Sequence, residues 1–315
     1  MADEGDLLVV LCDLVLLRPD NPCAGSLDVA PPEILSQLLA FTNAYTMLSS
    51  HNRLAVFAGQ HDFSHLVHLG LGEDASNTEV FPSSALHTRL TGLVKQCAAV
   101  AAVAGPGAAA AAAAAGTAAS GQAAGPTFAL SGALSRALCL IHRLQQQQAA
   151  AGGRPRGRPR VLALLGCGDA AAQYIPVMNA IFSAQRAEVV LDAVVLSPQD
   201  SSFMQQAAHL TGGLYFRPHR GRGLLGVLLN HFVCDTATRK QLDEAQALGV
   251  DFRASCFCHK YVIETGYVCS VCLSIFCQAS RACSTCGTAF GAGGRAVGAA
   301  GAGGVGAGAA AGAGA

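Results

Sequence analysis

Closely spaced cysteines are the residues of this chain best suited to chemistry. Seven of its thirteen cysteines fall between Cys256 and Cys286, and two C-x-x-C pairs among them are separated by ten residues. The pairs are Cys269 with Cys272 and Cys283 with Cys286. Each pair forms a tight turn that directs two thiolates at one ion, so two pairs supply the tetrahedral sulfur set of a structural zinc site. Four thiolates leave no coordination position for water or substrate. We therefore predict a Zn²⁺ ion that stabilises the fold and does no chemistry.

A second set of potential metal ligands lies in the same segment and consists of Cys256, Cys258, His259 and Cys277. By number alone, these residues allow a second ion. The C-x-C-H sequence is crowded for one centre, however, because neighbouring side chains of an extended chain point in opposite directions. We favour one zinc, with Cys277 packed as a small apolar residue, and leave the second ion open. A single site of this kind contributes on the order of 10 kcal/mol to folding.

The alternative use of such cysteines is a set of disulfides, which requires an oxidising compartment. The segment Met-Ala-Asp-Glu-Gly-Asp before the first apolar run lacks the basic region of a secretory signal. The apolar run Leu7–Leu17 is too short to cross a membrane and contains Asp13. The stretch 98–119 is almost entirely alanine and glycine and is broken by a Gly-Pro-Gly sequence. We expect an intracellular chain with reduced thiols.

The composition argues against a strongly charged partner. The formal net charge is zero, so no global basic field favours nucleic acid. Hydrophobic residues make up 51% of the chain, but many are alanines in low-complexity tracts, and aromatic residues are only 6%. The leucine, valine, isoleucine and phenylalanine residues outside those tracts are enough for a domain of about 200 residues.

The remaining sequence alternates strand patterns with helix patterns. Continuous apolar runs predict strands over 7–14, 53–60, 65–69 (at a sheet edge), 161–165, 189–196 and 214–216. Helices are predicted over 31–50, 84–103, 131–148, 170–186 (interrupted by Pro176), 202–210 and 224–233. Strands alternating with helices indicate an α/β fold with a mostly parallel sheet covered on both faces.

The predicted domains follow from these patterns. Residues 1–251 form the sheet domain, with low-complexity insertions over 98–126 and 145–160 that we expect to be loops. Residues 252–290 form the zinc module. Residues 291–315 are nearly pure glycine and alanine and are expected to be disordered, because they bury too little apolar surface to become ordered.

Four segments carry a family resemblance: C-F-C-H-K-Y-V-I-E-T-G-Y-V-C-S-V-C-L-S-I-F-C at 256–277, S-G-A-L-S-R-A-L-C-L-I-H-R at 131–143, N-R-L-A-V-F-A at 52–58 and T-G-G-L-Y at 211–215. Over most of residues 6–290, the chain resembles the family of the smaller von Willebrand A-type core subunit of general transcription factor IIH. The resemblance implies a von Willebrand A-like domain followed by a C4 zinc module, with no enzyme activity. It also implies a nuclear subunit that pairs with a larger sister subunit, also with a von Willebrand A domain and zinc modules. That pair helps to anchor a repair helicase in a complex that acts in transcription initiation and nucleotide excision repair.

Domains of the von Willebrand A type often bind Mg²⁺ through a D-x-S-x-S motif, a threonine and a second aspartate. Here the first motif begins at Asp13 and has apolar residues at both serine positions, while Thr127 and Asp169 stand where the other ligands would be. Mg²⁺ requires near-octahedral oxygen coordination. We therefore expect no functional Mg²⁺ site and predict that Asp13 and Asp169 cap helix N-termini instead.

Two further motifs have more than one interpretation. The sequence G-x-G-x-x-G at 221–226 is typical of nucleotide-binding loops, but no second parallel strand is expected after it, and we interpret it as a loop that caps a helix. The sequence Pro155-Arg156-Gly157-Arg158-Pro159 is similar to peptides that enter the minor groove of A·T-rich DNA. Any DNA contact through this loop would be auxiliary.

We predict that the zinc module docks through an apolar surface of Tyr261, Val262, Ile263, Val268, Leu273, Ile275 and Phe276, which it is too small to bury by itself. Two alternatives to a structural subunit remain. A RING-type ubiquitin ligase would need eight ligands in alternating pairs around two zinc ions. A direct DNA-binding protein would use the zinc module and the arginine loop, but only Lys260 and Arg281 lie close to the cysteine pairs.

Overall fold

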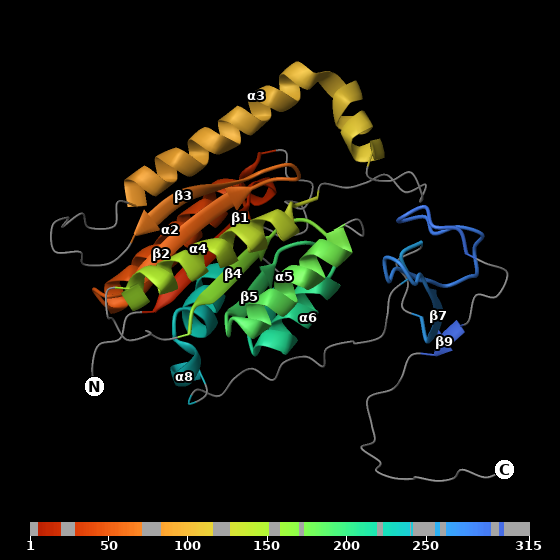
Figure 1. The fold of residues 1–315 in the computed structure, drawn as a ribbon. Coiled ribbons are helices and arrows are strands. Elements are labelled where there is room, and N and C mark those ends of the chain that lie inside the picture. Colours follow the sequence, from red (N-terminus) through yellow and green to blue (C-terminus); the bar gives the residue numbers. More distant parts are fainter. Residues whose placement is uncertain are drawn as a thin grey trace, which may run out of the picture. The chain divides into compact units, whose positions relative to one another are not determined.

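The computed structural model of the protein divides into two compact units, Met1–Asp251 and Phe252–Ala315. It describes residues 6–19, 29–70, 83–115, 127–150, 158–169, 173–218, 223–239, 241, 256–258, 263–290 and 296–298. The first unit contains a six-stranded sheet with helices on both faces, and the second contains a three-stranded sheet (Figure 1).

The strands of the first unit follow the order β3-β2-β1-β4-β5-β6. Their bounds are Leu7–Asp13 for β1, Arg53–Gly59 for β2, Ser64–Gly70 for β3, Arg160–Leu165 for β4, Val190–Val195 for β5 and Tyr215–Phe216 for β6. All neighbouring strands are parallel except β2 and β3, which are antiparallel. The prediction of a mostly parallel sheet, with the strand after β2 at one edge, is confirmed.

The central strand β1 is buried on both faces, because it lies between two parallel neighbours and beneath helices on each side. Successive side chains of a strand point to opposite faces. Leu8, Val10 and Cys12 therefore pack into one hydrophobic core, and Val9 and Leu11 pack into the other. This explains why the strand reads as a continuous apolar run.

Helical segments cover both faces of the sheet (Figure 1). On the first face lie α2 (Pro31–Leu48), the start of α3 (Ser83–Ala115) and the consecutive segments α7 (Leu224–Val227) and η3 (Leu228–Phe232), the last of which is a π-helix. On the second face lie α4 (Leu130–Ala150), α5 (Tyr174–Arg186) and α6 (Ser202–Thr211).

Both segments predicted as loop insertions are partly helical. Helix α3 continues to Ala115 and α4 continues to Ala150, so the expected starts of the insertions at residues 98 and 145 are wrong. Alanine has the highest helix propensity, and glutamine is also a good helix former, so these tracts extend the helices before them. Pro106 lies within α3, and this helix bends in Figure 1, as expected where proline removes a backbone hydrogen bond. Among the described residues, no helix is both long enough and apolar enough to cross a membrane.

Helix α5 is not interrupted by its proline, contrary to the prediction. Pro176 is the third residue of this helix, which begins at Tyr174. The first N–H groups of an α-helix have no partner within the helix, so a proline in the first turn removes no hydrogen bond.

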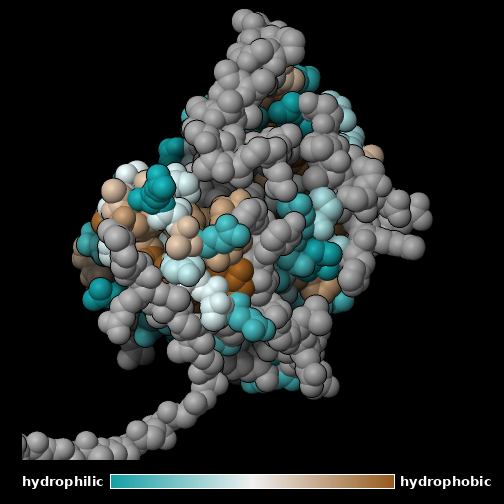
Figure 2. Space-filling view, turned by 90° about the vertical axis from the view of Figure 1, so that its right-hand side faces the viewer, coloured by the Kyte–Doolittle hydropathy of each residue, from teal (hydrophilic) through white to brown (hydrophobic). Residues whose placement is uncertain are grey.

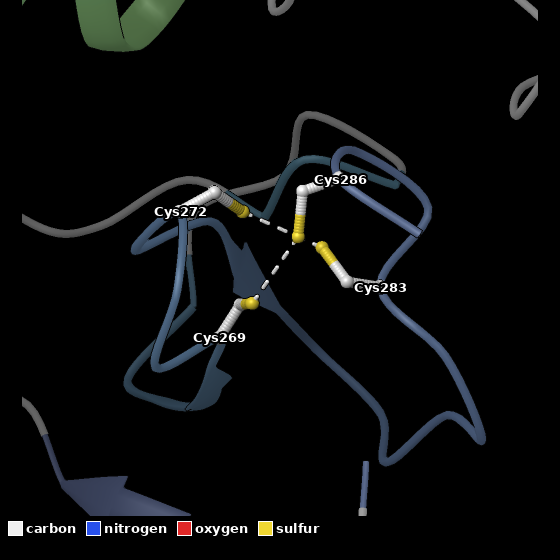
Figure 3. Close-up of side chains that lie close together, drawn as sticks. All are labelled: Cys269, Cys272, Cys283 and Cys286. Carbon is white, nitrogen blue, oxygen red and sulfur yellow. Dashed lines mark hydrogen bonds between the residues drawn. The ribbon is translucent and has the colours of Figure 1, made fainter. Parts of the chain in front are cut away.

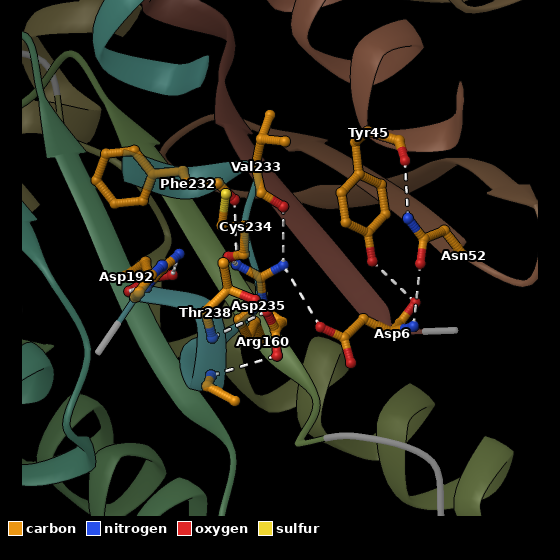
Figure 4. A network of polar contacts seen from close by, with 12 residues as sticks. Asp6, Tyr45, Asn52, Arg160, Asp192, Phe232, Val233, Cys234, Asp235 and Thr238 are labelled. Atoms are coloured by element: carbon orange, nitrogen blue, oxygen red, sulfur yellow. Dashed lines mark hydrogen bonds and ion pairs between the residues drawn. The ribbon is translucent and has the colours of Figure 1, made fainter. Parts of the chain in front are cut away.

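Arg160, the first residue of β4, is fully buried and connects β4 to two other segments (Figure 4). Its guanidinium donates hydrogen bonds to the main-chain carbonyls of Phe232, Val233 and Cys234, at the end of η3. One of its nitrogens lies 3.8 Å from a carboxylate oxygen of Asp6. A cation at this position satisfies carbonyls that the helix leaves without partners. The residue therefore fixes the end of η3 against the sheet.

A second buried arginine pairs with a carboxylate inside the sheet. Arg239, at the end of the short helix α8 (Thr236–Arg239), donates to both carboxylate oxygens of Asp192 in β5, at 2.8 and 2.7 Å. Asp192 also accepts from the N–H of Leu214 at 2.8 Å. The Arg239 guanidinium lies 5.4 Å from the centroid of the Phe232 ring. The pair holds α8 against the sheet of the first unit.

The second unit contains three short strands in the order β8-β7-β9. Their bounds are Thr265–Val268 for β7, Ile275–Phe276 for β8 and Ala296–Gly298 for β9. Strand β9 falls in the glycine- and alanine-rich tail that we expected to be disordered throughout, and it pairs antiparallel with β7. That expectation is wrong for these residues, since strand pairing uses backbone groups that every residue other than proline offers.

Candidate metal centre

The two C-x-x-C pairs of the second unit bring four sulfur atoms together (Figure 3). The Sγ atoms of Cys269, Cys272, Cys283 and Cys286 all lie within 4.8 Å of one another. Those of Cys269 and Cys286 are 3.7 Å apart, and those of Cys272 and Cys283 are 3.5 Å apart. A tetrahedron of thiolates around zinc, with Zn–S bonds of about 2.3 Å, has S···S edges of about 3.8 Å. The four predicted ligands thus have the spacing that a tetrahedral ion requires.

Each pair belongs to a six-residue turn, C-S-V-C-L-S from Cys269 and C-S-T-C-G-T from Cys283, and the turns share their hydrogen bonds. The N–H of the fifth residue, Leu273 or Gly287, donates to the carbonyl of the first, at 2.9 and 2.8 Å respectively. The N–H of the first residue donates to the carbonyl of the sixth, at 2.9 and 2.8 Å. The thiol of the fourth residue lies 3.1 Å from the hydroxyl of the sixth in both turns. The two turns therefore present their sulfur atoms in the same way.

The fifth position of each turn has a left-handed backbone. Gly287 has φ 75°, which costs a glycine nothing, whereas Leu273 has φ 60°. A residue with a Cβ atom pays roughly 1–2 kcal/mol for this conformation. The first turn therefore closes with some strain, and the leucine side chain that causes it is 62% exposed.

Hydrogen bonds and burial shift the pKa values of Cys269, Cys283 and Cys286 in different directions. The N–H of Cys272 lowers the pKa of Cys269, and the Thr288 hydroxyl lowers the pKa of Cys286 to about 6. Burial raises the pKa of Cys283 to about 11. A metal binds thiolates, so binding must displace any remaining protons. The turns thus supply part of the deprotonation, and the ion would supply the rest.

The surrounding packing gives the group a small apolar support. Cys269, Cys272 and Cys283 are buried together with Phe276, whose ring meets that of Phe290 edge to face, with centroids 6.2 Å apart. Cys286 is exposed. All the cysteines that the structure describes are free thiols. Four soft thiols at tetrahedral spacing, three of them shielded from water, suit a thiophilic divalent ion such as Zn²⁺.

The structure also gathers three of the four residues of the second predicted set. The Sγ atoms of Cys256, Cys258 and Cys277 lie within 4.8 Å of one another, and those of Cys258 and Cys277 are 3.3 Å apart. Cys277 is partly exposed and faces these thiols, which differs from the prediction that it packs as a small apolar residue. His259 lies outside the described residues. The number and spacing of these residues were the sequence signal for this group, although the crowded C-x-C-H sequence favoured a single ion.

At the carboxyl end of β1, Asp13 is occupied by backbone donors. It is the N-cap of the 3₁₀-helix η1 (Leu14–Leu17) and accepts from the N–H of Val15 at 3.0 Å. Its other oxygen accepts from the N–H of Gly166, just after β4, at 3.0 Å. Burial raises the pKa of Asp13. The predicted role of Asp13 as a helix cap is confirmed.

Asp169 likewise serves the N-terminus of α6. One of its oxygens accepts from the Ser202 hydroxyl and from the N–H of Phe203, both at 3.0 Å, and the other accepts from the Ser201 hydroxyl. Burial raises the pKa of Asp169. The predicted capping role of Asp169 is confirmed too, and Ser201 itself is the N-cap residue of α6.

A small pocket beside Asp169 lies where a von Willebrand A domain would hold Mg²⁺. Its lining is mostly apolar, with a single carboxylate: Phe128, Leu130, Leu165, Cys167, Gly168, Asp169, Gln173, Val177 and Phe203. Thr127, the remaining predicted position, precedes the first of these residues in sequence and is not part of the lining. A hard cation needs several oxygen ligands, which this lining does not offer.

The other two motifs are only partly described. Gly223 is the N-cap of α7 and has φ 89°, as expected for a loop that caps a helix, while residues 221 and 222 lie outside the described residues. Arg158 of the arginine loop lies 4.0 Å from Glu188, and both side chains are largely exposed. Arg156 and Gly157 are not among the described residues.

The predicted apolar surface of the second unit is present in part. Of the predicted residues, Val268 and Leu273 are exposed, and Ile263 and Ile275 are half-buried. Val271, which was not among the predicted residues, is exposed as well. Phe276 is buried in the unit, contrary to the prediction, because its ring is the main apolar support beneath the cysteines. Tyr261 and Val262 lie outside the described residues. Where it is coloured, the molecular surface in Figure 2 mixes hydrophobic and hydrophilic residues.

Comparison with known sequences covers both units. The family profile described as Transcription factor Tfb4 matches residues 7–287. The chain is 33% identical over 298 residues to the general transcription and DNA repair factor IIH subunit tfb4 of Schizosaccharomyces pombe, covering 91% of this chain and 90% of that protein. It is 47% identical over 166 residues to the subunit TFB4 of Arabidopsis thaliana, covering 53% of this chain and 54% of that protein. A 47% identical match to General transcription factor IIH subunit 3 of Dictyostelium discoideum covers 51% of this chain and 42% of that protein. The chain thus spans about half the length of these last two relatives.

Comparison with solved structures concerns the fold. The crystal structure of the TFIIH p34 N-terminal domain superposes with a TM-score of 0.56 at 22% sequence identity, covering 72% of this chain and 98% of that domain. This likeness shows the fold alone, which is von Willebrand A-like, with a mostly parallel sheet between two helical layers.

Proposed function

Because this chain belongs to the Tfb4 family of transcription and DNA repair factor IIH subunits, we propose that it is a non-catalytic structural subunit of that factor. In this role it supports transcription initiation by RNA polymerase II and nucleotide excision repair in the nucleus. The observation that carries the proposal is the family match, which extends from residue 7 to residue 287 and so spans the strands of the main sheet and the cysteine pairs.

The carboxylates at the carboxyl end of the sheet support the non-catalytic role. Asp13 and Asp169, which would be the charged ligands of a Mg²⁺ site, accept hydrogen bonds from backbone N–H groups and serine hydroxyls. A carboxylate with this many donors has few lone pairs left for a cation or a substrate. The sheet unit is then available as a binding surface, because the function of a fold is set by the sites it carries and not by the fold itself.

We propose that the group of Cys269, Cys272, Cys283 and Cys286 holds a structural Zn²⁺. Support comes from the S···S distances of 3.5 and 3.7 Å and from the matching hydrogen bonds of the two turns. The ion would use all four thiolates and would contribute on the order of 10 kcal/mol to folding of the second unit. Residues 252–290 would then be a zinc module, separate from the sheet domain of residues 1–251 and followed by the tail 291–315.

The chief partner in this proposal is the larger sister subunit, which also has a von Willebrand A domain and zinc modules. Val271 and Leu273 offer it an apolar contact next to the zinc site, because both are exposed. Leu273 supports this assignment further, since its backbone conformation would be less strained with glycine. A leucine at this strained backbone position, with its apolar side chain exposed, is favoured when the side chain contacts a partner.

The test is co-expression of the full chain with the other core subunits, followed by affinity purification and quantitative mass spectrometry. We expect the helicase and the sister subunit at a fixed ratio to this chain. The double change Val271→Asp and Leu273→Asp should reduce the recovery of the sister subunit by at least about tenfold if the surface contributes about 1.4 kcal/mol or more. The matched control is Met47→Asp, because Met47 is an exposed apolar residue on α2 of the other unit. Recovery of the wild-type chain as a lone monomer would overturn the proposal.

A RING-type ubiquitin ligase is the second candidate, because the two cysteine groups alternate along the sequence. Cys256 and Cys258 precede Cys269 and Cys272, and Cys277 precedes Cys283 and Cys286. Purified chain incubated with ubiquitin, its activating enzyme and a panel of conjugating enzymes distinguishes the two functions. A structural subunit should build no ubiquitin chains, and chain formation that is lost with Cys269→Ala would favour the ligase. For a DNA-binding protein, affinity for duplex DNA should fall steeply with added salt and should weaken in the Arg156→Ala, Arg158→Ala variant.

A further inference from the structure

We propose that Cys256, Cys258 and Cys277 form a second structural metal site, for Zn²⁺ or a similarly thiophilic divalent ion. This inference goes beyond the proposed function, which requires only the four-cysteine site.

The four-cysteine group provides an internal standard for the distances. Its neighbouring sulfurs are 3.5 and 3.7 Å apart, and the Sγ atoms of Cys258 and Cys277 are 3.3 Å apart. All three sulfurs of the second group lie within 4.8 Å of one another, which is the same bound that the first group meets. Both groups are therefore near the tetrahedral S···S edge of about 3.8 Å expected for zinc.

The backbone explains how a C-x-C segment can serve one centre. The N–H of Phe257 donates to the carbonyl of Ile275 at 2.8 Å, so residues 256–258 lie beside the end of β8, which leads directly into Cys277. Residues 257 and 258 form a turn, and the Sγ atoms of Cys256 and Cys258 on either side of Phe257 lie within 4.8 Å of each other. Phe257 packs against the apolar group around Phe276, which leaves Cys256 and Cys258 to face Cys277. The crowding expected from the sequence concerns adjacent residues and does not apply to a pair spaced by two.

A bound metal ion explains why three thiols lie together, whereas a disulfide explains only two of them. A disulfide would join two sulfurs and leave the third without a role. Cys256 is only 2% exposed, and three polar sulfur groups gathered at a partly buried position favour a cation that binds all of them as thiolates. Zinc sites with three cysteines and one other ligand are common. The proposal depends on the three cysteines alone.

The order of the two groups along the chain gives the second site a mechanical role. The segment between Cys258 and Cys277 contains Cys269 and Cys272 of the first site, and the segment between Cys272 and Cys283 contains Cys277 of the second. Each ion would therefore close a loop that contains ligands of the other. A unit whose described apolar core is as small as Phe276 and its few neighbours gains most of its stability from such links.

The test is the metal content of the purified full chain, measured by elemental mass spectrometry and by native mass spectrometry under reducing conditions. We expect two ions per chain for the wild type and one for Cys277→Ser. The matched control is Cys139→Ser, because Cys139 is an exposed free cysteine on α4, and this variant should keep two ions. One ion in the wild-type chain would overturn the proposal, and so would an unchanged count in Cys277→Ser.

A measurement on the wild-type chain keeps the test valid if Cys277→Ser fails to fold. The metal is first removed from the chain, and the chain is then titrated with Co²⁺. The absorbance of the thiolate-to-cobalt charge-transfer band should increase until two equivalents of Co²⁺ per chain have been added. Brief alkylation of the zinc-loaded chain, read by peptide mass spectrometry, should leave Cys256, Cys258 and Cys277 unmodified. Saturation at one equivalent, alkylation of these three residues, or a disulfide between Cys258 and Cys277 would exclude the second site. A one-ion chain that still assembles with its partners would remove this inference and leave the proposed function intact.

Discussion

The carboxyl edge of the main sheet and the cysteine-rich unit both hold side chains that are able to bind metal ions, but they use them differently. At the sheet edge, Asp13 and Asp169 accept hydrogen bonds from backbone and serine donors. In the second unit, the thiols of each group face one another at 3.3 to 3.7 Å. Residue types that bind metals therefore predict a metal site only when no stronger local partner takes their lone pairs.

The difference has a chemical cause. Carboxylate oxygens are strong acceptors, and the first N–H groups of a helix lack partners within the helix, so an aspartate at a helix start is readily used as a cap. Sulfur is a weak acceptor. The backbone competes less for a cysteine than for an aspartate, and the thiols remain available for an ion.

Removing one thiol of the four-cysteine group should have the largest effect. Cys269→Ala should lower the metal content by at least one ion per chain and should unfold the second unit, because the site contributes on the order of 10 kcal/mol to its folding. Elemental analysis and limited proteolysis between residues 256 and 290 provide the measurement, with Cys139→Ala as the matched control. If Cys269→Ala keeps the wild-type metal content and protection, the contrast between the two regions fails.

A buried carboxylate that pairs with an arginine should be the next most sensitive position. Asp192→Ala leaves Arg239 buried without a counter-charge and should destabilise the sheet unit by about 3–5 kcal/mol, measured by chemical denaturation. Asp200→Ala breaks an ion pair of similar length, 2.8 Å with Arg217, but its partners are 52% and 30% exposed. That control should lose less than about 1 kcal/mol. Equal losses at the two positions would show that burial does not decide the value of these pairs.

The capping role of Asp169 predicts that its removal causes a smaller loss of stability, and that this loss does not depend on a metal ion. Asp169→Ala leaves three donors at the start of α6 without their acceptor and should cost about 1–3 kcal/mol. Millimolar Mg²⁺ should change the melting temperature of neither the wild type nor the variant. If Mg²⁺ raises the melting temperature of the wild type and not that of the variant, Asp169 binds Mg²⁺, contrary to what the apolar lining of this pocket indicates.

The buried thiol of Cys12 in β1 should make the stability of the sheet unit depend on pH. Burial raises the pKa of Cys12 to about 12, compared with about 8.5 in an unfolded chain. Between these values the unfolded chain loses its proton and the folded chain keeps it, so the stability that the neutral thiol provides is complete below about pH 8.5 and is lost as the pH rises towards 12. The stability advantage of the wild type over Cys12→Ala should fall by about 1 kcal/mol between about pH 8 and about pH 9.5. Denaturation curves at the two pH values measure it, and a constant difference would contradict the buried, protonated state.

The sheet was predictable because buried parallel strands leave a strong sequence signal. The runs that became β1, β4 and β5 are apolar at nearly every position, which only a strand covered on both faces requires. The four-cysteine group was equally accessible, because a C-x-x-C pair is a local geometry. The roles of Asp13 and Asp169 followed from their positions at loop ends before helices.

The features that the sequence did not predict depend on long-range contacts or on weak local preferences. Arg160 binds carbonyls more than 70 residues away, and Arg239 binds Asp192 across 47 positions, and no local pattern marks either contact. The extension of α3 follows from alanine propensity, which competes with glycine and proline in the same tract. Cys277 was misjudged, because its partners at residues 256 and 258 come close only through the pairing of residue 257 with Ile275.

The position of the ligand turns late in the sequence has a consequence for synthesis of the chain. The last described element of the sheet unit ends at Arg239, whereas the four-cysteine group is incomplete until Cys286 has been added. A nascent chain can therefore form its sheet while it is still attached to the ribosome, since domains generally fold from the N-terminus during translation. With the proposed Zn²⁺ site, metal loading would come afterwards, and a cell short of zinc would accumulate chains whose sheet unit is folded and whose cysteine-rich unit is not.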